Sequence, residues 1–417
     1  MTPTAAPPLS AAARRRDFAL LLTGAAVSTV GGSLALLAVM VHLEPAGPGW
    51  IAAAWAGELV PIVLLAPVVG RIIDRVRNRE LLLSAIALQA VALAVCGLFG
   101  VRPGGEVVII GSLALLGMGT AVANPVIAAL LPRVSGEEHA TRAYGWYSMI
   151  TQAGFLAGFA VAGVLVDATS ERTALLLAAA TSVVMAAAVA FIRTQRIPAP
   201  DGERHGESVW LGFARVRADR VLLVGVSGLG MAVLMSVLVN VAEVFYVLDD
   251  IGASASAYGL VTALWPAAGI VGGWYAGRLS GDVVLSRWLA GTTVAVGLAL
   301  VVAGSVVSIV AVGLGWLIGG AANTAQRVCL NALIRSRTDD AARGRVFSAV
   351  SGVLQAGNIV GLAAGATVVA LVGARASMLG AGAATAVVGG VMLWLGRRVP
   401  AAPVPDDAPR PMTYPAR

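Results

Sequence analysis

The sequence predicts an all-α integral membrane protein with twelve transmembrane helices, arranged as two pseudo-symmetric six-helix bundles. The chain of 417 residues is 58% hydrophobic and only 12% charged, with a mean hydropathy of +0.85. A soluble domain carries about 25% charged residues, so this chain has too little polar surface to cover a soluble globule. Twelve apolar segments, each near the length of about 20 residues that spans a bilayer, take up most of the chain.

Six apolar segments precede a polar linker and six follow it. The first six predicted spans cover residues 18–43, 51–72, 81–100, 107–131, 144–166 and 174–192. The last six cover residues 221–248, 258–279, 288–307, 309–334, 346–372 and 376–395. The predicted organisation is a tail (1–17), a six-helix half (18–192), a linker (193–220), a second six-helix half (221–395) and a second tail (396–417). A short amphipathic helix on the membrane surface is expected at residues 209–216 of the linker.

The distribution of arginine predicts how the chain lies in the membrane. The sequence contains no lysine, and 25 of its 29 basic residues fall in segments that share one side when the N-terminus is placed in the cytoplasm. Three arginines fall in loops on the other side, and Arg327 lies inside a span. Basic residues concentrate on the cytoplasmic side of membrane proteins, so both termini are expected in the cytoplasm of a plasma (inner) membrane protein.

Several classes of site are excluded by residue type. Cys96 and Cys329 lie inside apolar runs, and His42, His139 and His205 are scattered, so no metal site is expected. Without lysine there is no nucleotide-binding loop of the Gly-x-x-x-x-Gly-Lys-Ser/Thr type, which excludes ATP-driven transport by this chain alone. The arginines occur in short tracts between spans rather than in a groove, so no nucleic-acid partner is expected. We expect no cofactor and no enzymatic activity.

Two observations carry a family resemblance. Residues 129–142 recur in pattern at residues 332–345, which indicates two repeated halves. Residues 70–79, Gly-Arg-Ile-Ile-Asp-Arg-Val-Arg-Asn-Arg, lie between spans 2 and 3, and this segment resembles the signature loop of the major facilitator superfamily. Within that superfamily, residues 343–348 and 16–18 are similar to segments of the macrolide-efflux and enterobactin-exporter branch.

The resemblance implies a secondary active transporter that works by alternating access. The expected function is proton-coupled efflux of a hydrophobic or amphipathic small molecule, such as an antibiotic, drug or secondary metabolite. Its partners would be that substrate, protons and membrane lipids, and the protein would be a monomer. Antiporters of this superfamily often carry a proline in span 5, where this chain has Phe159.

Other functions stay open at this stage. Export of a siderophore or another anionic metabolite is favoured if Arg327 faces the cavity, and uptake of a nutrient is the third transport option. A receptor, an assembly factor or a passive channel would also fit twelve spans. An intact signature loop argues against a protein that never changes conformation.

Glu58 is the predicted proton-coupling residue and a predicted substrate contact. It lies twelve residues before Gly70, about 18 Å from the end of span 2 along a helix. A carboxylate at such depth is costly and faces the protein interior or a water-filled cavity. Burial favours its protonated form, so it can take up and release a proton as the conformation changes.

Arg327 in span 10 and Asn124 in span 4 occupy matching depths in the two halves. Spans 1, 4, 7 and 10 line the cavity in proteins of the superfamily, so both residues are predicted substrate contacts, and Arg327 is expected to bind an anionic group or neutralise Glu58. Further predicted cavity residues are Gln89, Gln152, Asn240, Asn323 and Trp265. Glu243 is interpreted as an acid at the outer rim.

The signature loop supplies the predicted gate. Gly70, Asp74 and Arg75 lie at the end of span 2, where a charge pair can hold the cytoplasmic side closed. Arg345, after span 10, is expected to take part from the second half. A degraded copy of the loop occurs at residues 277–282.

Overall fold

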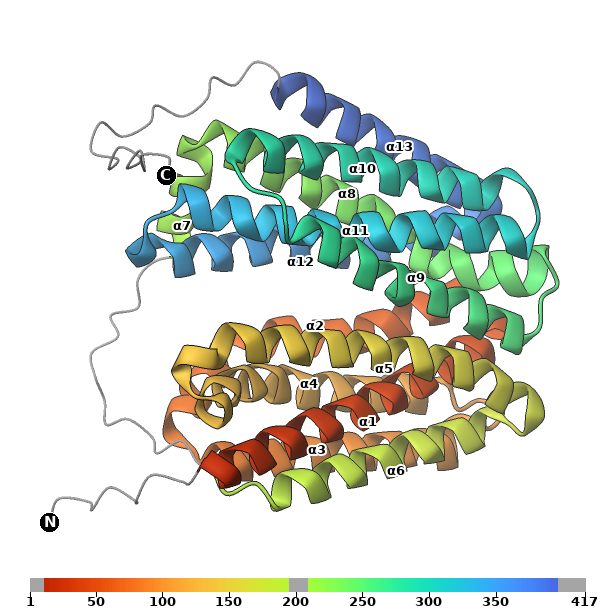
Figure 1. The fold of residues 1–417 in the computed structure, drawn as a ribbon. Coiled ribbons are helices and arrows are strands. Elements are labelled where there is room, and N and C mark those ends of the chain that lie inside the picture. The colour runs from red at the N-terminus through yellow and green to blue at the C-terminus, as the bar shows by residue number, and fades with distance from the viewer. Residues whose placement is uncertain (1–10, 195–208, 397–417) are drawn as a thin grey trace, which may run out of the picture.

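The computed structural model describes residues 11–194 and 209–396, and every secondary-structure element in these ranges is a helix. Twelve of these helices are long and apolar enough to cross a membrane, which confirms the predicted class and number of spans. They form two bundles (Figure 1), and the helix contacts assign six spans to each. Most of the first predicted tail, almost all of the second, and residues 195–208 of the predicted linker lie outside the described ranges.

The spans follow the predicted order along the chain. The first bundle contains α1 (Ala11–Leu43), η1 (Glu44–Ala46), α2 (Pro48–Arg75), α3 (Asn78–Val95), η2 (Cys96–Gly100), α4 (Glu106–Ser135), η3 (Glu137–His139), α5 (Ala140–Ala168) and α6 (Glu171–Ala190). The helix α7 (Val209–Ala218) precedes the second bundle. That bundle contains α8 (Arg220–Phe245), η4 (Tyr246–Asp250), α9 (Ala255–Ala276), α10 (Asp282–Ser305), α11 (Ile309–Arg337), α12 (Asp340–Val372) and α13 (Ala374–Gly396).

The two bundles are built by the same packing scheme. In the first bundle α1 packs on α5 and α6, α4 on α2 and α3, and α3 on α6. In the second bundle α8 packs on α12 and α13, α11 on α9 and α10, and α10 on α13. Each contact in one bundle therefore has its counterpart six spans later in the chain, which is the predicted pseudo-symmetry.

Several helix starts in the structure carry side-chain caps. Ser308 Oγ accepts a hydrogen bond from the Val310 N–H at the start of α11, and Ser170 Oγ accepts one from the Thr173 N–H at the start of α6. Such caps satisfy backbone donors that have no partner inside the helix.

Some helices begin before the apolar segment that predicts them, and α10 begins at Asp282 rather than at residue 288. Asp282, Ser286 and Arg287 interrupt the apolar residues before position 288, which lowers the mean hydropathy of this first part of the helix.

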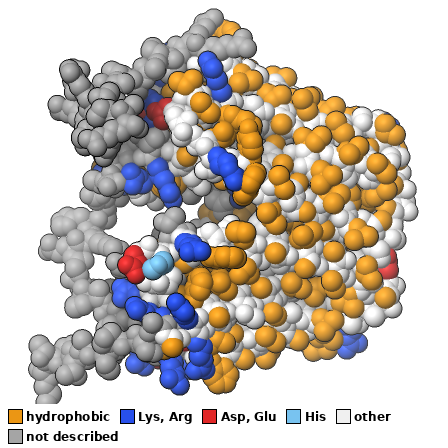
Figure 2. Space-filling view, viewed as in Figure 1, with side chains coloured by type: hydrophobic (Ala, Val, Ile, Leu, Met, Phe, Trp, Pro, Cys, Tyr) orange, Lys and Arg blue, Asp and Glu red, His pale blue; other side chains and the backbone are white. Residues whose placement is uncertain are grey.

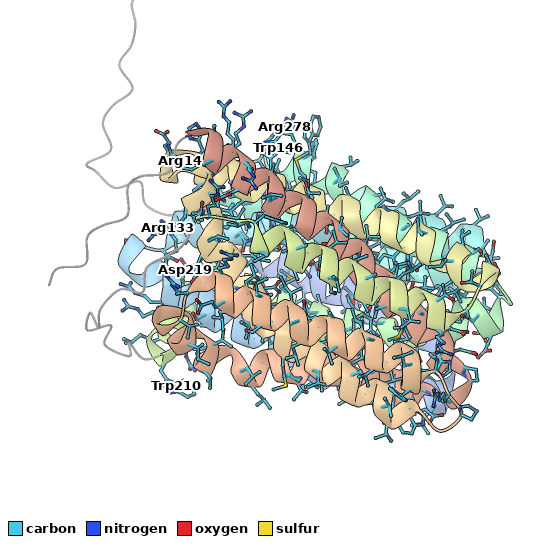
Figure 3. The ribbon with its side chains drawn as sticks, turned by 90° about the horizontal axis from the view of Figure 1, so that it is seen from below. Arg14, Arg133, Trp146, Trp210, Asp219 and Arg278 are labelled. Atoms are coloured by element: carbon cyan, nitrogen blue, oxygen red, sulfur yellow. The ribbon has the colours of Figure 1, made fainter. Side chains whose placement is uncertain are left out.

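We call the end of the molecule at which α7 lies, α1 begins and α13 ends the α7 side, and the other end the opposite side. Arg14, Arg133, Asp219 and Trp210 all lie toward the α7 side (Figure 3).

On the α7 side, the buried carboxylate of Asp17 joins the start of α1 to the segment that follows α6. Its Oδ2 accepts hydrogen bonds from the backbone N–H groups of Arg193 and Thr194 and from Thr194 Oγ1, at 3.0, 2.8 and 2.7 Å.

The short helix expected in the linker is present as α7. It packs against α12, and a Cβ atom at Gly212 would overlap the backbone carbonyl of Arg345. Trp210 is 78% exposed and Leu211 is also exposed. The helix is thus attached to the second bundle through its glycine face, and its contact with a membrane surface stays a prediction.

The two bundles contact each other mainly through α5 and α9. A Cβ atom at Gly163 of α5 would overlap the carbonyl oxygen of Ala255, and one at Gly259 of α9 would crowd the carbonyl oxygen of Phe159. Asp167 Oδ2 also accepts a hydrogen bond of 2.7 Å from the Ser256 N–H, so a carboxylate of the first bundle lies at the N-terminus of α9. These residues bring the bundles together toward the opposite side.

We expect Gly163→Val to separate α5 from α9, because the new side chain cannot fit against the α9 backbone. Spin labels at Arg172 and Asp250, which are exposed in different bundles at the opposite side, should report longer distances than in the parent protein. Gly111→Val is the matched control, because a Cβ atom there meets no atom within 4 Å. Unchanged distances in Gly163→Val would contradict the assigned contact.

Candidate functional site

A cavity of about 320 Å³ lies between the two bundles. Figure 2 shows the surface hollowed between them on the α7 side, which is also the side where the basic side chains gather. The second bundle supplies most of the wall, and the first bundle supplies Leu36, Leu37, Met40, Trp55 and Phe159. The volume falls within the range that binds small organic molecules.

The cavity wall combines apolar surface with a small number of polar side chains. The polar and charged residues among its lining are Ser236, Asn240, Glu243, Tyr258, Thr262, Asn323, Gln326, Arg327 and Asn358. They come from α8, α9, α11 and α12, so the polar side of the cavity belongs to the second bundle. The residues from the first bundle are all apolar or aromatic. Such a wall suits a molecule with one polar and one apolar face.

Glu243 is the acidic residue of this wall. Its Oε1 accepts hydrogen bonds from Trp316 Nε1 at 3.0 Å and from Thr262 Oγ1 at 3.2 Å. The carboxyl group thereby connects α8 with α9 and α11. Hydrogen bonds to a charged group contribute about 1.5–3 kcal/mol each, so these donors stabilise a carboxylate in an otherwise apolar region.

Arg327 is the basic residue of the wall. It lies on α11, is exposed to the cavity, and makes no hydrogen bond or ion pair with any residue in the described ranges. Trp316, which binds Glu243, lies eleven residues earlier on the same helix, so the two positions are about 16 Å apart along its axis. The cavity therefore carries an acidic and a basic side chain at different depths, and only the acidic one is hydrogen-bonded within the described residues.

Aromatic rings form the wall between these two depths. Trp265 and Trp316 meet edge to face, with ring centroids 5.6 Å apart and an interplanar angle of 82°. Small residues on α11 make room for them, since a Cβ atom at Gly319 would lie 2.6 Å from the Trp265 ring. Phe159 stacks on Phe155 of the same helix with centroids 6.3 Å apart. Aromatic rings offer a large, rigid apolar surface for a bound molecule.

The family of this architecture is shown by a family model described as Major Facilitator Superfamily, which matches residues 17–313 and residues 227–414. The chain belongs to the major facilitator superfamily. It is therefore a multi-pass membrane protein of a transporter superfamily. No curated protein sequence matches it.

Solved structures show the same fold. A mutant of the nucleoside transporter NupG has a TM-score of 0.73 with 10% identity, covering 91% of this chain and 99% of that one. A bacterial homologue of the human lysosomal transporter Spinster, in an inward-facing and unoccupied conformation, has a TM-score of 0.72 with 14% identity and covers 94% and 98%. A bacterial homologue of the iron transporter ferroportin, in an inward-facing state, has a TM-score of 0.71 with 17% identity and covers 92% and 99%.

Several predicted substrate contacts of this superfamily member lie in the cavity wall. These are Asn240 on α8, Trp265 on α9, and Asn323 and Arg327 on α11. Gln326 lies beside them but is 2% exposed and donates a hydrogen bond of 2.6 Å to Thr293 Oγ1 on α10. Its amide therefore holds two helices of the second bundle together.

The predicted residues of the first bundle lie away from the cavity wall. Glu58 is partly buried, lies where the α2 backbone contacts Gly117 of α4, and has no hydrogen bond or ion pair with the described residues. Gln89 donates a hydrogen bond of 3.0 Å to Thr120 Oγ1 within the bundle. Asn124 is exposed on α4, and the amide of Gln152 approaches Gly269 of α9. Arg327 accordingly does not pair with Glu58.

The predicted gate is described only in part. Helix α2 ends at Arg75, but the side chains of Asp74 and Arg75 and the surroundings of Gly70 lie outside what the structure describes. Arg345 is partly buried near the start of α12, where α7 packs. The role of these four residues in gating stays a prediction.

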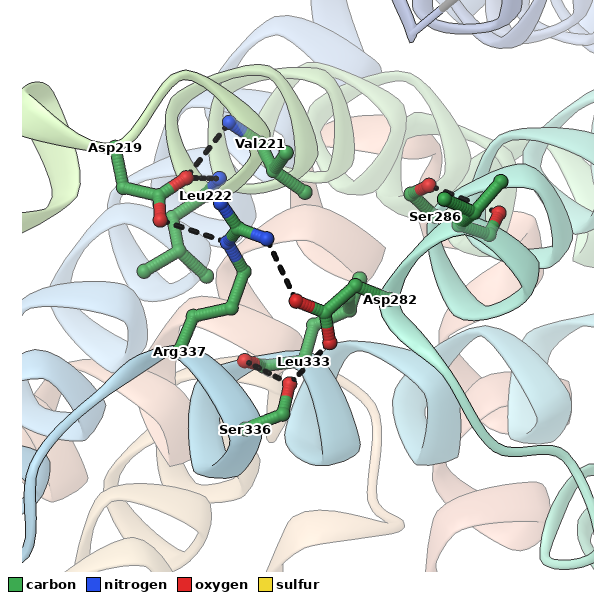
Figure 4. Close-up of polar contacts among 9 residues, drawn as sticks. Asp219, Val221, Leu222, Asp282, Ser286, Leu333, Ser336 and Arg337 are labelled. Atoms are coloured by element: carbon green, nitrogen blue, oxygen red, sulfur yellow. Dashed lines mark hydrogen bonds and ion pairs between the residues drawn. The ribbon is translucent and has the colours of Figure 1, made fainter. Parts of the chain in front are cut away.

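The degraded copy of the signature loop has clear partners (Figure 4). Asp282 at the start of α10 accepts a hydrogen bond of 2.6 Å from Arg337 Nη1 at the end of α11, and Arg337 Nε donates one of 2.7 Å to Asp219. The other oxygen of Asp219 accepts hydrogen bonds from the Val221 and Leu222 N–H groups. Arg337 thus connects the starts of α8 and α10 on the α7 side.

The position of Glu243 in the structure differs from the position predicted from the sequence. Counted from Val221, it was expected at the outer rim, whereas the structure places it in the cavity wall. The helix continues as α8 and η4 to Asp250, so Glu243 lies more than a turn inside its end. Thr262 and Trp316, which bind it, are a threonine and an aromatic residue on other helices, and spacing along the chain does not reveal such contacts. In the described ranges no group of three His, Cys, Asp or Glu residues could hold a metal ion.

Proposed function

We propose that this protein is a secondary active transporter that moves an amphipathic small molecule through the cavity between its two bundles. The observation that carries the proposal is the wall itself, which places an arginine with no partner among the described residues, a hydrogen-bonded carboxyl group and several aromatic rings around one space. In this conformation the bundles contact each other mainly through α5 and α9, toward the opposite side. If the bundles separated there and came together on the α7 side, the cavity would open to the opposite side of the membrane. Alternation between two such arrangements is the expected transport cycle.

The proposed location is the plasma membrane, with the α7 side in the cytoplasm. Support comes from the arginines, which the sequence concentrates on that side, and Figure 2 shows apolar side chains over the flanks of both bundles. In this orientation the conformation described here faces inward. The proposed direction is efflux, supported by the resemblance of residues 343–348 and 16–18 to exporter segments.

For the substrate, the cavity favours an amphipathic molecule with an anionic group over a purely hydrophobic drug. An arginine inside a membrane protein is stable where it reaches water or a partner, and Arg327 lines the cavity without a partner among the described residues. A carboxylate or phosphate group of the substrate would pair with it, and the apolar part would lie against Trp265 and Trp316. An amphipathic anion fits both the efflux of a drug with an acidic group and the alternative function, export of an anionic metabolite.

Two carboxyl groups are candidates for proton coupling. Glu58 is the one predicted from the sequence, and Glu243 is the one that lines the cavity. A coupling group must be reached from both sides of the membrane in turn, and a residue in the wall of an alternating cavity meets this requirement. We therefore propose Glu243 as the coupling residue of the conformation described here.

We expect Arg327→Gln to weaken transport of anionic substrates selectively. The assay compares the uptake of two matched amphipathic dyes, a carboxylate and its methyl ester, into inside-out vesicles. Loss of a charge-assisted pair should raise the apparent KM for the carboxylate about tenfold or more and leave that for the ester within about twofold. Arg327→Lys should retain part of the preference. Equal effects on both dyes would contradict an anion-binding role.

We expect Glu243→Gln to abolish transport driven by a proton gradient and to retain exchange of substrate across the membrane. Glutamine can still accept the hydrogen bond of Trp316, so the wall should persist while the titrating group is lost. Glu58→Gln is the comparison variant and should respond to a protonophore as the parent protein does. The reverse pattern would return the coupling role to Glu58, and loss of exchange in both would point to a structural role.

A further inference from the structure

A second pocket lies on the α7 side of the first bundle, away from the cavity. It has a volume of about 380 Å³ and is formed by the start of α1, the end of α4, η3 and the start of α5. Its lining residues are Arg14, Arg15, Phe18, Val134, Ser135, Gly136, Glu138, His139, Arg142, Ala143 and Trp146. None of them lines the central cavity, so this pocket is separate from the proposed substrate site.

The pocket collects positive charge from distant parts of the sequence. Arg14 and Arg15 come from α1 and Arg142 from α5, and all three side chains are exposed. No hydrogen bond or ion pair joins any of them to another side chain that the structure describes. The one carboxyl group in the lining, that of Glu138, lies 3.4 Å from His139 Nδ1 rather than beside an arginine. Three exposed guanidinium groups therefore lie around one pocket.

The pocket also lies at the level where a membrane begins. The apolar spans of α1 and α5 start at Ala12 and Arg142, next to the arginines. Trp146, one turn further along α5, is 47% exposed and lines the same pocket, and Figure 3 shows it with Arg14 toward the same edge of the molecule. Arginine and exposed tryptophan together are typical of the membrane interface, where phosphate groups meet the first part of the acyl chains.

The rule that basic residues lie on the cytoplasmic side requires only their charge. It does not require arginines from two helices to converge on one concave pocket with an aromatic wall. We propose that this pocket is a binding site for an anionic phospholipid. Its arginines bind the headgroup phosphate, and Trp146 and Phe18 contact the adjoining acyl chain.

The test measures lipid retention by native mass spectrometry on the full chain, released from nanodiscs of equal parts phosphatidylglycerol and phosphatidylcholine. The parent protein should keep phosphatidylglycerol in preference to phosphatidylcholine. The variant Arg14→Gln/Arg15→Gln/Arg142→Gln should lose this preference about tenfold or more. The control Arg217→Gln/Arg287→Gln/Arg335→Gln removes the same charge from exposed positions outside the pocket and should keep the preference. Equal losses in both triple variants would overturn the proposal, because net charge alone would then explain retention.

Two further arms keep the result decisive. Trp146→Ala retains every arginine and should still shorten the retention of phosphatidylglycerol; if the triple variant does not fold, an unchanged Trp146→Ala variant overturns the lipid assignment. Inorganic phosphate at millimolar concentration should not displace the lipid, because it has no acyl chain to contact the aromatic wall. Displacement by inorganic phosphate would show a site for a soluble anion and would overturn the proposal.

Discussion

Charge inside a membrane must be paired or must reach water, and this constraint decides where the functional residues of the protein lie. Arg327 satisfies the constraint by lining the cavity, and Glu243 satisfies it by accepting hydrogen bonds from Trp316 and Thr262. Among the described residues, the acidic group of the cavity is therefore hydrogen-bonded and the basic group is not. An anionic substrate would give Arg327 a partner. The need of a buried charge for a partner therefore also explains the preference for anionic substrates that we propose.

The pairing of the two bundles depends on a different constraint, which is close contact of helix backbones. Within each bundle the same helices pack on each other, and between the bundles α5 contacts α9 as α12 contacts α2. Glycine at positions 163 and 259 allows the α5 and α9 backbones to touch. Beside these glycines, the Ser256 N–H donates a hydrogen bond to Asp167, and buried apolar residues of both bundles, among them Val166 and Tyr258, pack in one cluster.

The fold was predictable from the sequence because apolar segments of membrane length can be counted directly. The number of arginines in each loop predicts on which side of the membrane that loop lies. Depth along a span was predictable as well, which is why Arg327 and Asn323 were found. The direction in which a side chain points was not, since Glu58 lies at the α2–α4 contact and Gln89 binds within its own bundle. Glu243 was placed at the rim because it was counted along the helix from Val221, and such a count does not show that the side chain lines the cavity. Contacts such as those of Trp316 join helices far apart in the chain and follow only from packing.

The most direct test of this account is the accessibility of the cavity. Ser236 lines it, while the two native cysteines, Cys96 and Cys329, are buried and can be replaced by alanine. A Ser236→Cys variant is treated with a membrane-impermeant thiol reagent in inside-out and right-side-out vesicles, with a cysteine at the exposed position of Asp250 (Asp250→Cys) as the control for the opposite side. The account predicts labelling at position 236 in inside-out vesicles and its reduction by an anionic substrate. Labelling only in right-side-out vesicles, or none in either, would contradict a cavity that faces the cytoplasm in this state.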